Sequence, residues 1–286
     1  MSKDLAIDPF DIREGRAMVS LGPLTSNKHC TFDCSYCYVP VEQFGNYPNY
    51  TVPGIVRWLG ERSTEFDIVY VSGDTDSFAK PRTNEGLDLL EAIASDLPGK
   101  DVLFTTKYVL NQEEIDRLDL INQTVEENRR LLFGCTSVAQ LTNPEIEKHP
   151  IPSPMERLRQ LKTFHDIGMV SVLAMRPFLP NVNPDDYTRI LEEAHRQRAD
   201  IALGESWWVD LAGKIEDKTL GDGVRTPANE TTTQPMPFDD NEAFWKCYEP
   251  EKLVITCERI CKKLGMPFFM RSRPAIELAR KERNLE

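Results

Sequence analysis

Short apolar and β-branched runs recur along the first two thirds of the chain, and longer amphipathic stretches separate them. Such runs are typical of strands that are buried on both faces of a parallel sheet. Their starts lie roughly 30 to 50 residues apart, which is the size of a βαβ unit. The six predicted strands are Ala17–Leu21, Ile68–Ser72, Val102–Thr106, Leu131–Val138, Val170–Met175 and Ile201–Leu203.

The amphipathic stretches between these runs predict helices at Asn84–Ser95, Ser153–Asp166 and Pro184–Arg198. In the second of them, Ser-Pro followed by Glu156 is a favourable helix start. Six successive βα units predict an α/β fold in which helices cover a parallel sheet. Periodicity alone leaves open whether that sheet is an incomplete barrel or an open one. In either case we expect the chemistry in loops that follow the carboxyl ends of the strands.

The pattern stops after about residue 210. Residues 211–241 are rich in Gly, Thr, Pro and Asp and predict a long loop or lid. A helix at Asn241–Leu264 and a short strand at Met266–Met270 are expected to follow. We therefore divide the chain into a barrel unit, residues 1–210, and a C-terminal unit, residues 211–286, whose loop, helix and short strand pack on the barrel.

Charge and hydropathy make several classes of function less favourable, namely general nucleic-acid binding and membrane insertion. The 286 residues include 34 Lys and Arg against 46 Asp and Glu, a net charge of −12. An acidic protein is a poor general ligand for nucleic acid, although a local basic groove stays open. No apolar run approaches the length of a membrane span. Met1-Ser2-Lys3-Asp4 opens the chain without an apolar segment, so we expect a cytoplasmic protein with reduced cysteines.

Three cysteines lie close together in the loop after the first predicted strand. Cys30, Cys34 and Cys37 have the spacing C-x3-C-x2-C, which lets three thiolates surround one metal centre. Soft thiolates select zinc or an iron–sulfur centre. A zinc site needs a fourth ligand, and His29 is badly placed beside Cys30. An iron–sulfur cube normally takes four cysteines, so three leave one iron open for chemistry. We favour the cube, with zinc and unligated core thiols as alternatives.

This spacing, with Tyr36 just before the third cysteine, resembles the signature of the radical S-adenosylmethionine (SAM) superfamily. The resemblance implies a partial (β/α)6 parallel barrel and a [4Fe–4S] cluster on Cys30, Cys34 and Cys37. It also implies that the amine and carboxylate of SAM bind the fourth iron. Reductive cleavage of SAM would then give a 5′-deoxyadenosyl radical that abstracts hydrogen from a substrate, with electrons from a donor such as flavodoxin or ferredoxin.

Further strings resemble the spore photoproduct lyase-like branch of that superfamily. They are Ser153-Pro154-Met155-Glu156-Arg157-Leu158, the stretch Arg176–Asn183, and the pair Tyr36 and Tyr38 around Cys37. The lyase itself uses a cysteine hydrogen donor some forty residues beyond its cluster, whereas residues 38–134 contain no cysteine. We therefore expect a small-molecule, nucleotide or peptide substrate. Repair of a DNA lesion and a non-catalytic metal-binding protein remain alternatives.

Candidate site residues follow from the strand ends and from this resemblance. At least one carboxylate after the second strand is expected to accept from the SAM ammonium, with an Asx turn as the alternative. Cations at strand ends would pair with a carboxylate of SAM or substrate, or with an internal acid. Ser137 would contact SAM or cap a helix. The cofactor-binding candidates are Ser72, Gly73, Asp74, Asp76, Lys107, Ser137, Arg176 and Glu205. The catalytic candidates are Tyr36, Tyr38 and Cys135, although a small buried core thiol is the favoured interpretation of Cys135.

Three more cysteines fall near the C-terminus. Cys257 and Cys261 share one helical face, and Cys247 precedes them by ten residues. This spacing favours core cysteines on an amphipathic helix, with an auxiliary cluster as the alternative.

Overall fold

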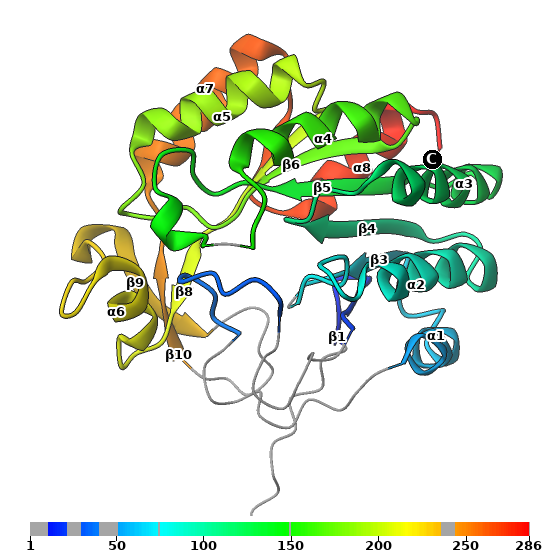
Figure 1. Ribbon diagram of the computed structural model, residues 1–286, viewed down its shortest axis with the longest axis horizontal. Helices are drawn as coiled ribbons and strands as arrows, with labels where there is room; N and C mark the ends of the chain where they lie inside the picture. Colours follow the sequence, from blue (N-terminus) through cyan, green and yellow to red (C-terminus); the bar gives the residue numbers. More distant parts are fainter. Residues whose placement is uncertain are drawn as a thin grey trace, which may run out of the picture.

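An eight-stranded sheet, in the order β1-β2-β3-β4-β5-β6-β7-β11, forms the frame of the protein (Figure 1). The computed structural model describes residues 11–21, 30–39, 51–73, 75–148, 150–235 and 244–285. Neighbours from β2 to β7 run parallel, β11 runs parallel to β7, and β1 forms a hairpin with β2. The strands are β1 (Asp11–Arg13), β2 (Arg16–Val19), β3 (Ile68–Val71), β4 (Asp101–Thr106), β5 (Leu132–Ser137), β6 (Val170–Met175), β7 (Ile201–Gly204) and β11 (Phe268–Phe269).

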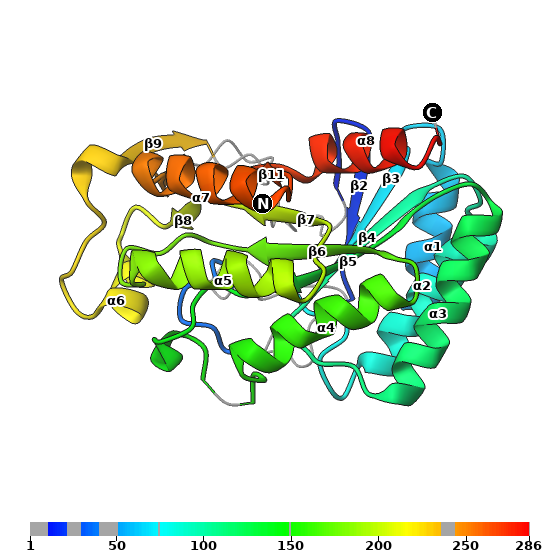
Figure 2. The same cartoon turned by 90° about the horizontal axis from the view of Figure 1, so that it is seen from above.

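The predicted α/β fold is confirmed, because β2 to β7 are the six expected strands and the sheet curls into a partial (β/α)6 barrel (Figure 2). Burial on both faces is visible in β4. Val102 and Phe104 pack outward under the helices, while Leu103 points inward against Phe133 of β5. This explains why the strands read as continuous apolar runs rather than as alternating patterns.

Helices cover the outer face of the sheet. Capping boxes at Asn111 and Ser153 start α3 and α4, and the second of these is the helix start expected from Ser153 and Glu156. The helices α1 and α3 were not predicted from the pattern. The outer helices are α1 (Val52–Glu61), α2 (Thr83–Asp96), α3 (Gln112–Glu127), α4 (Pro154–Asp166), α5 (Pro184–Arg196) and α7 (Glu251–Leu264).

The last helix, α8 (Ser272–Glu282), lies on the other side of the sheet (Figure 2). Its Ala275, Ile276 and Ala279 pack against inward side chains of the barrel such as Leu103 and Phe133. At the start of β4, the carboxylate of the buried Asp101 lies 3.5 Å from the guanidinium of Arg280. Helix α8 therefore covers the barrel interior near the amino-terminal ends of the strands. The carboxyl-terminal ends of the strands remain available for a site.

The expected long loop at 211–241 is wrong for residues 214–220 and 228–235. These residues form α6 (Lys214–Leu220), a 3-10 turn (Ala228–Glu230) and β9 (Thr231–Pro235). The Asp210 carboxylate accepts hydrogen bonds from the backbone N–H groups of Lys214 and Ile215, which starts α6. The buried Glu216 accepts from Thr226 and Lys246. Polar contacts of this kind leave no apolar periodicity, so the pattern missed the elements.

The expected helix at Asn241–Leu264 also needs correction. Within it, Phe244–Tyr248 form β10, and α7 begins at Glu251. β10 is the central strand of a small antiparallel sheet, between β8 (Trp207–Val209) and β9. The residues before Phe244, from 236 onward, lie outside the described part of the chain. The division of the chain near residue 210 stays a prediction. In the described part of the chain, no helix is both long and apolar enough to cross a bilayer.

Candidate functional site

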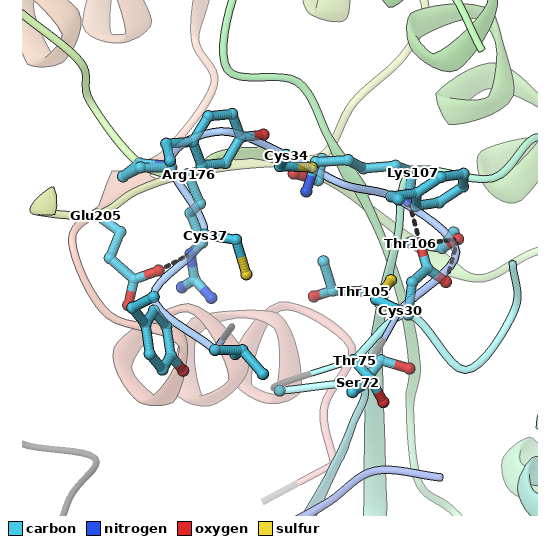
Figure 3. A pocket seen from close by; sticks show the side chains of 18 of the residues that line it. Cys30, Cys34, Cys37, Ser72, Thr75, Thr105, Thr106, Lys107, Arg176 and Glu205 are labelled. Carbon is cyan, nitrogen blue, oxygen red and sulfur yellow. Dashed lines mark hydrogen bonds and ion pairs between the residues drawn. The ribbon is translucent and has the colours of Figure 1, made fainter. Parts of the chain in front are cut away.

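A pocket opens at the carboxyl ends of the barrel strands, and its volume, with the mouth included, is about 930 Å³ (Figure 3). The cysteine loop after β2 forms one wall, and the ends of β3 to β7 form the others. Small-molecule and cofactor sites of barrel folds lie at this end of the strands. Of the residues expected at the site, it is lined by Cys30, Cys34, Tyr36, Cys37, Tyr38, Ser72, Gly73, Asp76, Lys107, Ser137, Arg176 and Glu205.

Three residues considered from the sequence are not part of this set. Asp74 and His29 lie outside the described residues. Cys135 is buried with no exposed surface and does not line the pocket. It sits beside Thr105, its partner in the β4–β5 pairing, which does line the pocket. Burial raises the pKa of the Cys135 thiol to about 12, so this thiol is neutral at physiological pH. Its role as a hydrogen donor stays a prediction.

The three thiols of the cysteine loop face the pocket from one short segment. Burial raises the pKa of Cys30 to about 11 and that of Cys37 to about 12. Burial also raises the pKa of Cys34, against the opposing effect of the Lys107 ammonium. Thiols without a metal are therefore protonated, and a soft metal centre would displace their protons. The donor set is three thiols, and the described residues of the loop add no fourth protein ligand to them. Such a set suits an iron–sulfur cube with one free corner.

A single metal ion fits this arrangement less well. Zinc holds each thiolate at about 2.3 Å, so its ligands must converge on one point. Among the described residues, no three His, Cys, Asp or Glu side chains are gathered in that way. An iron–sulfur cube would take each thiolate on a separate iron, so the three thiolates need not converge on one point.

Tyr36, between Cys34 and Cys37, is fixed from behind by buried partners. Its hydroxyl donates to the carboxylate of Glu147, which is also paired with the guanidinium of Arg157. A second nitrogen of Arg157 donates to the carbonyl oxygen of Ser137, 2.5 Å away, at the end of β5. Although burial by itself raises the pKa of Glu147, Arg157 and Lys107 outweigh it and lower the pKa, so this carboxylate stays ionised.

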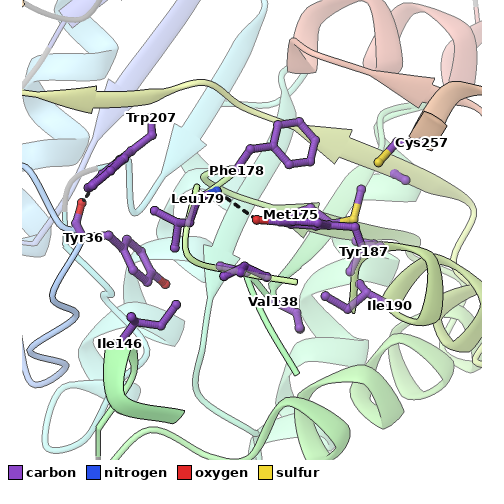
Figure 4. Close-up of a cluster of buried hydrophobic side chains, with 14 of the residues drawn as sticks. Tyr36, Val138, Ile146, Met175, Phe178, Leu179, Tyr187, Ile190, Trp207 and Cys257 are labelled. Atoms are coloured by element: carbon purple, nitrogen blue, oxygen red, sulfur yellow. Dashed lines mark hydrogen bonds between the residues drawn. The ribbon is translucent and has the colours of Figure 1, made fainter. Parts of the chain in front are cut away.

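The backbone of the same loop is tied to the aromatic core shown in Figure 4. Trp207 donates its indole N–H to the carbonyl oxygen of Tyr36 over 3.1 Å. The backbone N–H of Ser35 donates to the carbonyl oxygen of Ile146, also over 3.1 Å. The cysteine loop is thus attached to β8 on one side and to the turn before α4 on the other.

Lys107, directly after β4, is a buried cation in the pocket wall. Its ammonium lies 5.6 Å from the centre of the Tyr36 ring. Burial lowers the pKa of Lys107, but electrostatic interactions with Cys34 and Glu147 outweigh this effect and raise the pKa overall. A charged ammonium beside a small cavity is suited to bind a carboxylate.

Asp76 is engaged within the protein. Its two carboxylate oxygens accept from the Thr106 hydroxyl at 2.9 and 3.0 Å, and from the backbone N–H groups of Lys107 at 2.7 Å and Phe78 at 3.0 Å. The Asx turn considered from the sequence is therefore present. Asp76 holds the loop after β3 against the end of β4.

The loop after β3 also has an unusual backbone. Ser72 adopts a left-handed conformation with φ of 69°, which side chains other than glycine rarely adopt. Its hydroxyl accepts from the backbone N–H of Ser77, and its own N–H donates to the carbonyl oxygen of Val19. Strain of this kind is often kept at binding sites, and here it brings the backbone of Ser72 and Gly73 to the pocket.

The C-terminal cysteines are core residues. Cys247, Cys257 and Cys261 are all buried, with at most 1 % of their surface exposed. Burial raises the pKa of Cys257 and of Cys261 to about 12. The expectation of core thiols agrees with this burial.

Sequence reasoning missed several residues of the site. Glu147 gave no signal, because its importance depends on partners distant in the sequence. Thr106 belonged to a string noted at the end of the third predicted strand, but its bond to Asp76 was not foreseen. Arg157 belonged to a string noted for resemblance, but its role as a buried cation was not foreseen. Tyr70 of β3 also lines the pocket, and its hydroxyl lies 3.1 Å from that of Thr105.

Comparisons with known proteins agree with this geometry. A family model described as the radical SAM superfamily matches residues 25–194. A spore photoproduct lyase complexed with a dinucleoside spore photoproduct has a similar fold. The TM-score is 0.63 at 14 % identity, over 88 % of this chain and 81 % of the other. No curated protein matches the sequence.

A second solved structure is also similar in fold. It is the radical S-adenosylmethionine methyltransferase TsrM from Kitasatospora setae, with cobalamin and a [4Fe–4S] cluster bound. The TM-score is 0.56 at 12 % identity, over 86 % of this chain and 52 % of the other. At such low identities, both likenesses concern the fold alone.

Proposed function

The chain belongs to the radical SAM superfamily, and on this premise we propose that it abstracts hydrogen from a small-molecule, nucleotide or peptide substrate. Members of this superfamily bind a [4Fe–4S] cluster and SAM. Together these groups supply one-electron reductive cleavage of SAM to methionine and a 5′-deoxyadenosyl radical. An external donor, such as flavodoxin or ferredoxin, would provide the electron.

Cys30, Cys34 and Cys37 would hold the cluster in this proposal. Tyr36 keeps their loop in place through its buried hydrogen bond to Glu147. Because Tyr36 is fully engaged by Glu147 and Trp207, its role is to position the loop. Tyr38 lines the open pocket beyond the third cysteine and would contact the substrate.

The amino-acid end of SAM would bind between β3 and β5. Lys107 offers a charged donor to its carboxylate, and the Ser137 hydroxyl is a further hydrogen-bonding group at the end of β5. The backbone at Ser72 and Gly73 would receive the ammonium group. Asp76 would act through the loop that it holds. Exclusion of water by the aromatic side chains of the pocket would protect a radical from quenching.

The observation that carries this proposal is that one pocket gathers all three loop thiols with Lys107 and Ser137. Anaerobic reconstitution with iron and sulfide tests it, followed by incubation with SAM and dithionite. We expect about four iron and four sulfide per chain, as in a cube, and formation of 5′-deoxyadenosine. The Cys34→Ala variant is expected to lose both. A preparation that binds zinc but no iron, or a cluster that yields no 5′-deoxyadenosine, would overturn the proposal.

A second candidate is repair of a nucleic-acid lesion, which the fold of spore photoproduct lyase favours. The net charge of −12 is against it, because phosphate binding needs a basic surface. Binding of a short DNA duplex at rising salt decides between the two. Tight binding that weakens steeply with salt would support repair, and absence of binding would leave the smaller substrate.

A further inference from the structure

One side of the pocket is not used by the proposed contacts to SAM. Lys107 lies on one side of the cavity, and Arg176 and Glu205 lie on the other, at the ends of β6 and β7 (Figure 3). Tyr38 and Trp208 line the same pocket. If the proposed function holds, this side faces the substrate, and the following inference rests on that assignment.

Arg176 is a cation with an unmet hydrogen-bonding group. Its side chain is 13 % exposed, and its guanidinium points into the cavity (Figure 3). The Nε atom is buried and has no hydrogen-bond partner within the described residues. Glu205 forms an ion pair with Arg176, but its Oε2 atom lies 3.6 Å from Nε, which is beyond hydrogen-bond distance. A buried donor without a partner is costly, so a ligand that accepts from it is favoured.

A second guanidinium adds to the positive charge. Arg16 of β2 donates to the hydroxyl of Ser272 over 2.7 Å, and its own Nε is also buried without a partner. Burial lowers the pKa of Arg16, and the like charge of Arg176 lowers it further. Two cations thus act on each other beneath the pocket.

The acidic groups near these cations balance them only in part. Glu205 is the carboxylate with the largest effect on Arg176. Glu14 also acts on Arg16, but it lies in the turn between β1 and β2, within 3.8 Å of Arg271. Burial raises the pKa of the nearby Tyr70 hydroxyl, which is therefore neutral at physiological pH. Within the described residues, Glu205 is the pocket-lining carboxylate that acts on both guanidinium groups. The positive charge of Arg16 and Arg176 that it leaves favours an anion.

We infer that the substrate carries a carboxylate or phosphate group and that Arg176 binds this group at the end of β6. A guanidinium recognises the two oxygens of such an anion through parallel hydrogen bonds. The aromatic side chains of Tyr38 and Trp208 offer surface for an apolar or aromatic body. Arg176, which the sequence grouped with the cofactor contacts, is then a residue that determines substrate specificity.

The test measures binding rather than turnover. The reconstituted chain, with SAM and without reductant, is titrated with matched probes by ligand-observed NMR. Phenylacetate is compared with phenylacetamide, and phenyl phosphate with phenol, so the two arms distinguish carboxylate from phosphate. We expect the acid of at least one pair to bind at least tenfold tighter than its neutral partner. Arg176→Gln should abolish this preference, and Arg117→Gln, on the outer helix α3, should keep it.

Two further measurements keep the inference falsifiable if Arg176→Gln folds poorly. Glu205→Gln removes the competing carboxylate and should tighten binding of the preferred acid several-fold. The dissociation constant of SAM shows whether Arg176 binds the carboxylate of SAM or an anion of the substrate. Arg176→Gln should leave this constant unchanged, and Lys107→Gln should raise it. Equal binding of acids and neutral partners, failure of both acids to bind, or a tenfold loss of SAM affinity in Arg176→Gln overturns the inference.

Failure of this inference can be distinguished from failure of the proposed function. A chain that forms 5′-deoxyadenosine but binds acids and neutral probes equally retains the function and loses the anion site. A chain that prefers acids through Arg176 but forms no 5′-deoxyadenosine retains the site and loses the function.

Discussion

The hydroxyl of Tyr36 donates a hydrogen bond to the carboxylate of Glu147, which lies 111 positions further along the chain. Arg157 neutralises that carboxylate, and the side chains of Glu147 and Arg157 are at most 1 % exposed. The cysteine loop is thus held from its buried side by an ion pair that does not face the pocket. Removing one partner of such a pair leaves an uncompensated charge in the interior.

Glu147→Ala should therefore lower the free energy of unfolding by about 3–5 kcal/mol, the typical cost of breaking a buried pair. Urea denaturation of the protein before reconstitution measures this loss. Glu145→Ala, two positions earlier and 81 % exposed, is the matched control and should change stability by less than about 0.5 kcal/mol. The double variant Glu147→Leu with Arg157→Met should recover most of the loss. Equal stability of the two single variants would contradict the role of the pair.

Lys107→Gln should weaken binding of SAM by about tenfold to a hundredfold, because a hydrogen bond to a charged group contributes about 1.5–3 kcal/mol. Equilibrium dialysis of the reconstituted protein with labelled SAM gives the dissociation constant. The iron content should stay that of the unmodified chain. Lys162→Gln, an exposed lysine of α4, provides the control. Unchanged SAM affinity in Lys107→Gln would place the carboxylate of SAM elsewhere.

Gly86 in α2 should resist a substitution that normally stabilises helices. A Cβ at Gly86 would clash with the backbone carbonyl of Ser77, in the segment that follows the pocket loop. We expect Gly86→Ala to cost about 1–3 kcal/mol, the usual effect of overpacking. Gly60 in the last turn of α1 has open space around it, and Gly60→Ala should stabilise by about 0.4–1 kcal/mol. Thermal unfolding separates the two signs, and a stabilising Gly86→Ala would refute the packing argument.

The C-terminal thiols should contribute no iron. Cys257→Ala and Cys261→Ala are expected to keep the iron and sulfide content of the unmodified chain after reconstitution, since both thiols are buried core groups. Cys37→Ala should lose the cluster under the same conditions. If either C-terminal variant lost about half of its iron, an auxiliary cluster would have to be reconsidered.

The sequence predicted those parts of the fold that depend on neighbouring residues in the chain. Val170–Met175 is a strand with the expected bounds, because every residue of it is buried and apolar or small. α4 starts as expected because its capping box is local. The spacing of the three cysteines is local too, and all three line the same pocket from one loop, as the spacing indicated.

What the sequence did not predict depends on partners far along the chain. α6 and the strands around it are held by the buried Glu216, whose partners Thr226 and Lys246 lie ten and thirty positions away. The sequence favoured Asp76 or its neighbour as a ligand for SAM, and the turn role of Asp76 became clear only once Thr106 was placed beside it. Such pairings appear only once the sheet order is known.

The position of α8 bears on the order in which the protein matures. The inward side chains Leu103 and Phe133 belong to strands synthesised early, yet their cover is Ile276, near the end of the chain. While a ribosome is still translating the intervening residues, these apolar side chains stay open to water or to a chaperone. A nascent chain stalled before Ser272 would therefore expose the apolar inner face of its sheet. Chaperones and proteases that recognise exposed apolar surface would bind such a chain at this face.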